Sequence, residues 1–192
     1  MKKIQIFDST LRDGAQARGI NYSVRDKINV LKLLDHLGVD YIEAGNPASN
    51  PKEREFFNKV ADVELKHSKL VAFGSTRRKD IKAKDDAGVQ ALLSAGTDTV
   101  AIFGKTWDLH VTDVIGTTLD ENLNMIYDTI DYFKSQGKEV IFDAEHFFDG
   151  YKANPEYALD VLKTAEKAKA DCLVLCDTNG GTMLNEMRDA MR

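Results

Sequence analysis

Short apolar runs rich in β-branched residues recur along the chain at intervals of roughly 30 to 40 residues, and each is followed by polar residues. The runs lie at residues 4–7, 41–44, 70–73, 99–103, 140–142 and 172–176. Runs of this length are typical of the buried strands of a sheet. The pattern therefore predicts six β-strands.

Segments with apolar residues at three- and four-residue steps lie between these runs and after the last of them. This is the spacing of an amphipathic helix. The segments cover residues 25–37, 52–63, 82–95, 120–135, 155–170 and 183–191. Ser23, Asn50 and Asn154 stand where helices should begin. Gly38 and Gly137 stand where helices should end. Strands that alternate with helices, with no low-complexity linker, predict one α/β domain with a parallel sheet.

Polar residues follow every predicted strand, and this pattern helps to distinguish an open parallel sheet from a closed barrel. An open, doubly wound sheet uses mainly the strand ends beside its switch point, whereas a closed barrel gathers all of them around one mouth. The polar ends favour a (β/α)8 barrel of the TIM type. Because such a barrel has eight units in about 250 residues, we expect residues 1–192 to form a single partial barrel of about six units. Strands 7 and 8 and any C-terminal regulatory domain would be absent.

The composition argues against a nucleic-acid-binding protein and against a membrane protein. The net charge is −5 and 30% of the residues are charged, so no broad basic surface and no nucleic-acid partner are expected. No apolar run is long enough to cross a bilayer, and residues 1–3 lead directly into strand-like sequence. We therefore predict a cytoplasmic protein with no membrane partner. Cys172 and Cys176 are expected to be buried free thiols in a reducing compartment.

The stretch from Asp8 to Gln16 carries the clearest candidate chemistry. It follows the first predicted strand and places Arg12 beside Asp13, just before the turn residue Gly14. A carboxylate there can bind a hard cation, and a guanidinium can stabilise negative charge that develops on an oxygen. A solvated loop with a surface ion pair would contain the same residues. The nonapeptide favours a functional role without deciding it.

Longer motifs carry a family resemblance. Residues 8–16, 41–47 and 72–78 resemble the N-terminal part of the metal-dependent, acyl-CoA-condensing (β/α)8 barrels, which include the 2-isopropylmalate, homocitrate and citramalate synthases. Residues 103–112, 142–156 and 175–181 resemble the citramalate synthase group in particular. The resemblance covers the chain essentially from end to end.

The resemblance implies an acyltransferase that performs a Claisen-type condensation. The methyl carbon of acetyl-CoA would add to the ketone of a 2-oxo acid, and the thioester would then be hydrolysed. Pyruvate is the first expected 2-oxo acid and would give (R)-citramalate, in branched-chain amino-acid biosynthesis; a branched or longer acid is the second. A divalent metal ion (Mg²⁺, Mn²⁺ or Zn²⁺) is implied as the Lewis acid that polarises the ketone.

The same resemblance assigns roles to five residues. Asp13 matches the metal ligand, and Arg12 matches the residue that holds substrate oxygens as charge develops. Glu145 matches a catalytic glutamate that orients or relays protons near the reacting carbons. Thr178 matches the threonine that hydrogen-bonds the carboxylate of the 2-oxo acid. Glu43 lies in the second-strand motif, and we count it with the substrate-binding residues.

Ordinary structural roles stay open for two of these residues. Glu145 stands next to His146, and one of the two could only support the other. The hydroxyl of Thr178 could simply cap the turn that follows it. The sequence favours the functional role for Glu145 and for Thr178.

Two further questions have no answer in the sequence. Glu43 could be a buried acid paired with Arg77 or with Arg12, because buried carboxylates are seldom left without a partner. The loop at residues 105–110, which contains a lysine, a tryptophan and a histidine, could close over substrate or only pack the rim.

The chain also departs from the family pattern. Ala15 and Asn46 stand where such proteins often have an acidic and an aromatic residue, so substrate choice is less firmly implied than reaction class. The His-x-His pair expected for the metal at a seventh strand is missing, and His36 and His67 are more typical of the surface. We therefore expect an N-terminal fragment that is inactive alone. Open strand edges predict a homodimer or a covering partner.

Two other functions stay open. A carbon–carbon lyase of the same barrel type, acting on a hydroxyacyl-CoA or a hydroxy acid, would use the same groups in reverse. The motif at residues 145–150 favours the synthase over the lyase. A non-catalytic half-barrel that binds another subunit fits the missing histidine pair and would bind no metal.

Overall fold

The computed structural model describes residues 4–191, which form two compact units. Within that range, residues 4–74 and 87–101 make up unit 1, and residues 75–86 and 102–191 make up unit 2. Residues 1–3, which were considered in the prediction of a cytoplasmic location, lie outside the described range. Each helix of residues 4–191 lacks the combination of length and apolar character that a membrane span requires.

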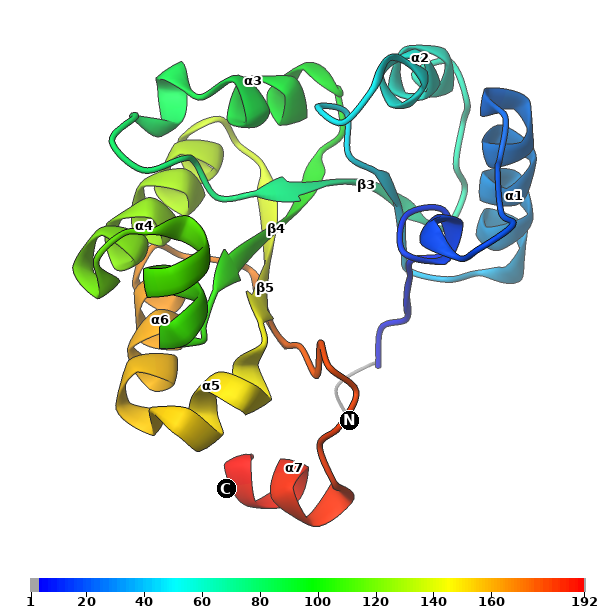
Figure 1. Cartoon of the computed structure of the whole chain (residues 1–192). Helices are drawn as coiled ribbons and strands as arrows, with labels where there is room; N and C mark the ends of the chain where they lie inside the picture. The colour runs from blue at the N-terminus through cyan, green and yellow to red at the C-terminus, as the bar shows by residue number, and fades with distance from the viewer. Residues whose placement is uncertain (1–3, 192) are drawn as a thin grey trace. The chain divides into compact units, whose positions relative to one another are not determined.

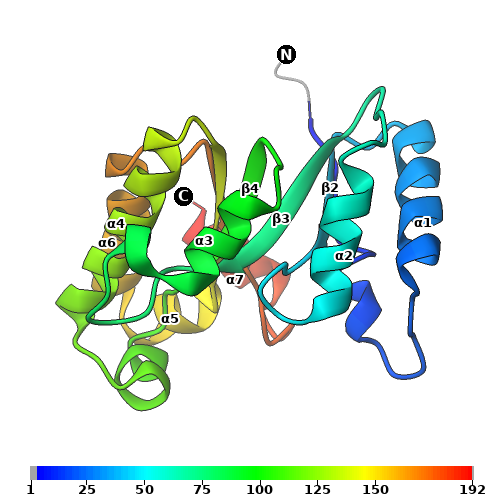
Figure 2. The same ribbon diagram turned by 90° about the horizontal axis from the view of Figure 1, so that it is seen from above.

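Unit 1 is built on parallel strands that follow one another in chain order. They are β1 (Phe7–Asp8), β2 (Tyr41–Gly45), β3 (Lys69–Ser75) and the start of β4 (Thr99–Lys105). Helices α1 (Val24–Leu37) and α2 (Pro51–Val60) lie side by side in this unit, which also contains α3 (Ala87–Ser94) and the 3₁₀ turn η1 (Gly14–Gln16) (Figures 1 and 2). Strand β2 is buried along its whole length, so its side chains form the centre of the unit's core.

Unit 2 contains the rest of β4 together with β5 (Glu139–Glu145) and β6 (Cys172–Leu175), and β5 and β6 are parallel. Its helices are α4 (Leu119–Ser135), α5 (Phe147–Ala153), α6 (Pro155–Lys167) and α7 (Leu184–Ala190). Helices α4 and α6 pack against each other, and α5 packs on α6 (Figure 1). Two short turns, η2 (Ala83–Asp85) and the π-helical η3 (His110–Ile115), complete the unit.

The helix ends confirm the predicted caps. The side chains of Ser23, Asn50 and Asn154 each accept a hydrogen bond from the backbone N–H three residues later. Gly38 ends α1 with φ 83°, and Gly137 follows α4 with φ 75°. Because L-residues with side chains rarely adopt these angles, glycine is the natural residue at both positions.

Three local predictions need correction. The first strand covers only Phe7–Asp8, because the N–H of Ile6 donates to the side chain of Asp40 instead of extending the ladder. The helix expected at 82–95 is divided into η2 and α3. Helix α5 was not predicted, because its seven residues are too few to show a clear period.

The expectation of buried thiols is also wrong. Cys172 is exposed and Cys176 is half-buried, and both are free. Strand β6 is the last strand in the order of the sheet, so its side chains are less covered than the alternating sequence suggested. Burial of part of the Cys172 side chain, with nearby Asp143, raises the pKa of its thiol. His36 and His67 are exposed, as predicted.

Asp35 fastens the segment before β3 to helix α1. Its buried carboxylate accepts hydrogen bonds from the backbone N–H groups of Lys66, His67 and Ser68, at 2.8–3.1 Å. Burial alone would raise the pKa of Asp35, but the bonds from these three N–H groups lower it from 3.8 to about 2. One ionised carboxylate therefore satisfies three backbone donors that would otherwise lose their partner.

We expect Asp35→Asn to lower the free energy of unfolding by roughly 2 kcal/mol at pH 6, since a drop in pKa from 3.8 to about 2 has this energetic equivalent. The carboxylate's contribution is complete above pH 3.8 and is lost as the pH falls through 2. Urea unfolding of both proteins at pH 6 and pH 2.5 should therefore show a gap that falls by more than half. An equal gap at both pH values would contradict this prediction.

Candidate functional site

In the loop after β1 in unit 1, three backbone N–H groups donate hydrogen bonds to one carbonyl oxygen. The oxygen of Ser9 accepts hydrogen bonds from the N–H groups of Arg12, Asp13 and Gly14, at 2.9–3.1 Å. Leu11 is buried beneath the loop. The buried leucine and the shared carbonyl hold the backbone of Arg12 and Asp13 in place, so these two side chains start from a rigid support.

Arg12 joins three of the predicted site residues into one cluster. Its Nε donates to Oε2 of Glu43 at 2.7 Å, and its Nη1 lies 3.0 Å from Oδ1 of Asp13. Its guanidinium carbon lies 4.0 Å from the ring centre of Phe73, a cation–π contact. Glu43 is completely buried. Of the two arginines considered from the sequence, Arg12 is shown to pair with Glu43.

The donor set at Asp13 does not form a complete metal site. The side chain of Asp13 is 65% exposed and supplies one carboxylate. Within residues 4–191, no three His, Cys, Asp or Glu side chains converge in a way that could hold a metal ion. Divalent cations of the expected kind take several oxygen or imidazole ligands. The described residues therefore offer one candidate ligand.

In unit 2, Glu145 stands at the end of β5 and forms an ion pair with Lys105 at the end of β4. The backbone N–H of Thr106 also donates to the carbonyl of Glu145, at 3.2 Å. Both charged side chains are partly exposed. The pairing was not predicted from the sequence, although both residues lie in the polar segments just after neighbouring apolar runs, which is the signal that could have indicated it.

His146 follows Glu145 in a left-handed backbone conformation, with φ 57° and ψ 35°. Such a conformation costs a non-glycine residue about 1–3 kcal/mol and persists where the surroundings enforce it. The N–H of His146 donates to Oγ1 of Thr178 at 2.9 Å. Its Nδ1 lies 3.1 Å from Oδ2 of Asp149. The structure therefore connects Thr178 to the end of β5 through His146.

The loop at residues 105–110 packs against this histidine. The ring centre of His110 lies 4.8 Å from that of Trp107 and 4.5 Å from that of His146. Burial lowers the pKa of His110, and the neighbouring His146 and Lys105 lower it further. The neutral form of the His110 imidazole is thereby favoured. These contacts show that the loop packs within unit 2 in the absence of substrate.

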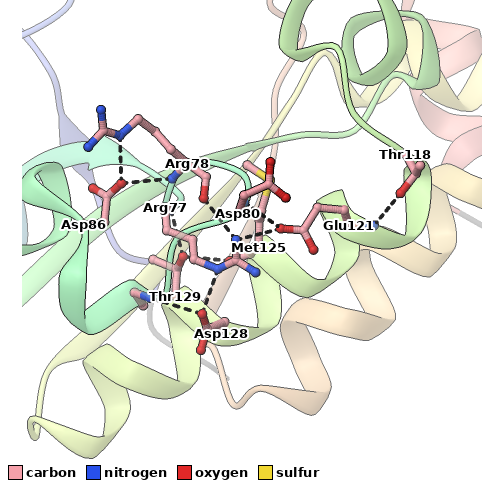
Figure 3. Close-up of polar contacts among 10 residues, drawn as sticks. Arg77, Arg78, Asp80, Asp86, Thr118, Glu121, Met125, Asp128 and Thr129 are labelled. Atoms are coloured by element: carbon pink, nitrogen blue, oxygen red, sulfur yellow. Dashed lines mark hydrogen bonds and ion pairs between the residues drawn. The ribbon is translucent and has the colours of Figure 1, made fainter.

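Arg77 belongs to a separate network, shown in Figure 3. Its buried guanidinium contacts Oδ2 of Asp128 at 2.7 Å and Oε1 of Glu121 at 2.8 Å, and its backbone N–H donates to Oγ1 of Thr129. The hydrogen bond from Arg77 lowers the pKa of Glu121. Arg77 thus fixes the segment after β3 onto α4.

A pocket of about 440 Å³ lies against this segment. It is lined mainly by the residues that follow β3 and by Phe103, Lys105 and Met125. Since Lys105 both lines the pocket and binds Glu145, the pocket adjoins the Glu145 ion pair. Unit 2 therefore contains a cavity, the Glu145–Lys105 ion pair beside it, and the imidazoles of His110 and His146.

Comparison with known sequences places the chain beside a group of synthases. It is 56% identical over 186 residues to the (R)-citramalate synthase of Aquifex aeolicus, a match that covers 97% of this chain and 35% of that protein. It is 52% identical to the (R)-citramalate synthase of Sulfolobus acidocaldarius, covering 97% and 36%. The 2-isopropylmalate synthase of the same organism is 37% identical, covering 93% and 44%. The chain spans about a third of the length of the citramalate synthases and matches their N-terminal part.

Comparison with solved structures bears on the fold. The hydroxymethylglutaryl-CoA lyase of Pseudomonas aeruginosa superposes with a TM-score of 0.78 at 20% identity, covering 99% of this chain and 63% of that chain. The HMG-CoA lyase of Brucella melitensis gives 0.79 at 17% identity, covering 100% and 67%. The predicted TIM-barrel type of α/β fold is confirmed. A family model described as HMGL-like matches residues 3–192, and because this match spans nearly the whole sequence, the chain belongs to the HMGL-like family.

Proposed function

We propose that the protein takes part in the Claisen-type condensation of acetyl-CoA with a 2-oxo acid, with pyruvate as the substrate and (R)-citramalate as the product. The observation that carries the proposal is the Arg12 cluster, in which an arginine is oriented by a buried carboxylate and an aromatic face. The identity of 50–56% to several (R)-citramalate synthases supports it. Acetyl-CoA and the 2-oxo acid are the small-molecule partners.

In this reaction, the methyl group of acetyl-CoA loses a proton and its carbon forms a bond to the ketone carbon of pyruvate. The ketone oxygen takes up the electron pair and then a proton. Water next cleaves the thioester and releases free CoA thiol. Negative charge thus develops on the thioester oxygen in one step and on the ketone oxygen in the next, and a fixed cation can stabilise both.

Arg12 is our candidate for holding these oxygens. Its Nε is bound to Glu43, so the orientation of the guanidinium is set before substrate arrives, and little reorganisation is needed in the transition state. Glu43 is counted among the substrate-binding residues in this proposal because it positions Arg12. Thr178 would donate its hydroxyl hydrogen to the carboxylate of the 2-oxo acid.

Glu145 is our candidate for moving the proton of the acetyl methyl group. Its carboxylate is partly exposed and paired with Lys105, so it is accessible, as a general base must be. Asp13 is proposed as one ligand of a divalent metal ion. A cytoplasmic location and a homodimeric assembly are further proposals.

The test is an assay of CoA thiol release from acetyl-CoA, with and without pyruvate, in the presence of Mg²⁺, Mn²⁺ or Zn²⁺. It is run on the 192-residue chain and on the same chain with any sequence that its reading frame encodes beyond residue 192. Pyruvate-dependent release with citramalate as the product supports the proposal. Cleavage of hydroxyacyl-CoA substrates without condensation would replace it with the lyase, and no pyruvate-dependent release from either protein would overturn it.

A further inference from the structure

His146 is held in its left-handed conformation from several sides. Its Nδ1 lies 3.1 Å from Oδ2 of Asp149 on α5. Its ring contacts the ring of His110, with centres 4.5 Å apart, and that of Trp107, with centres 5.9 Å apart. These contacts come from the loop after β4 and from α5, so neighbouring elements of unit 2 jointly enforce the strained backbone. Strain of this kind directly after Glu145 calls for a functional explanation.

The conformation directs the backbone N–H of His146 to Oγ1 of Thr178, at 2.9 Å. A hydroxyl that accepts this bond keeps its own hydrogen free to donate elsewhere. Thr178 is exposed, so that hydrogen can reach a ligand. Asp149 accepts a second bond at the same oxygen, from Nδ2 of Asn179 at 3.0 Å. The His146–Asp149 pair therefore holds the segment after β6 at two successive residues.

We infer that His146 is a positioning residue whose left-handed backbone orients Thr178, so that the threonine hydroxyl donates to the carboxylate of the 2-oxo acid. In the histidine, the bond from the imidazole to Asp149 offsets the strain of this conformation, a cost that a glycine at the same position does not have. The identity of the ligand rests on the proposed function, whereas the orientation of Thr178 by residue 146 does not. The role belongs to the backbone of His146 and so differs from that of a side chain that contacts substrate.

The variants His146→Gly and His146→Ala separate backbone from side chain. Both remove the imidazole, but glycine adopts the left-handed conformation freely and alanine does not. We expect the KM for pyruvate to stay within about threefold for His146→Gly and to rise about tenfold for His146→Ala, with kcat changed less, as for the loss of one hydrogen bond. Thr178→Val should resemble His146→Ala, and the double variant should add nothing further. A KM for His146→Gly as high as that for His146→Ala would overturn the inference.

A second measurement needs no activity. Hydrogen exchange of the residue 146 amide in the 192-residue chain, without substrate, should be faster in Thr178→Val than in the unaltered chain and unchanged in Thr178→Ser, which keeps the hydroxyl. Equal exchange rates in Thr178→Val and the unaltered chain would overturn the positioning role. If exchange responds as expected but pyruvate is not a substrate, the orientation of Thr178 stands and the proposed ligand is wrong.

Discussion

Glu145→Gln is expected to lower the rate of the proposed condensation by about 10²–10⁴-fold, the usual loss when a general acid or base is removed. Glutamine has the shape of glutamate but cannot take up a proton, and it also removes the negative charge that faces Lys105. The rate of CoA thiol release with saturating pyruvate and acetyl-CoA measures the effect. It is measured in the 192-residue chain or in the chain extended beyond residue 192, whichever is active.

The matched control is Glu166→Gln, which makes the same chemical change at an exposed position on α6. It should leave the rate within about twofold, because surface substitutions seldom have large effects. Urea unfolding of both variants separates a catalytic loss from an unstable fold. A rate for Glu145→Gln within threefold of that of the unaltered protein would show that Glu145 is not the general base of the reaction.

Arg12→Ala is expected to lower the free energy of unfolding by about 3 kcal/mol or more, the usual cost of removing one member of a buried ion pair. Glu43 is completely buried, so its carboxylate would lose a hydrogen-bonded cation without gaining contact with water. Urea unfolding at pH 7 measures the loss.

Two further variants test the cause of this loss. Arg18→Ala removes an exposed arginine from the same region and should change stability by less than about 0.5 kcal/mol. Adding Glu43→Gln to Arg12→Ala removes the buried charge, so the double variant should be more stable than Arg12→Ala alone. A double variant less stable than the single one would show that the charge of Glu43 is not the reason.

Much of the fold follows from local sequence. Alternation of apolar runs with helical periods places all six strands and most helices, because both patterns reflect which face of an element is buried. The caps at Ser23, Asn50 and Asn154 are equally local, since a short polar side chain bonds a backbone N–H only three residues away. The resemblance to the synthase family also points to Arg12, Asp13 and Glu145.

The sequence does not show which charged side chains, far apart along the chain, form ion pairs with one another. Arg12 and Arg77 are both basic and both follow a strand, yet only the folded chain shows that Arg12 binds Glu43 whereas Arg77 binds Asp128 and Glu121. The left-handed conformation of His146 has no local signal either, because contacts with other elements enforce it.

The two units are interleaved along the chain, and this affects the order in which they can fold during synthesis. The chain leaves unit 1 at Ser75 and returns to it for Ala87–Ala101. That later segment includes Leu92, whose side chain packs so closely on Gly74 that a Cβ on this glycine would lie 2.7 Å from Cδ1 of the leucine. A nascent chain of 74 residues therefore lacks the side chain that covers the end of β3. Although domains generally fold from the N-terminus as they emerge from the ribosome, unit 1 can close its core only after residue 101 has been made.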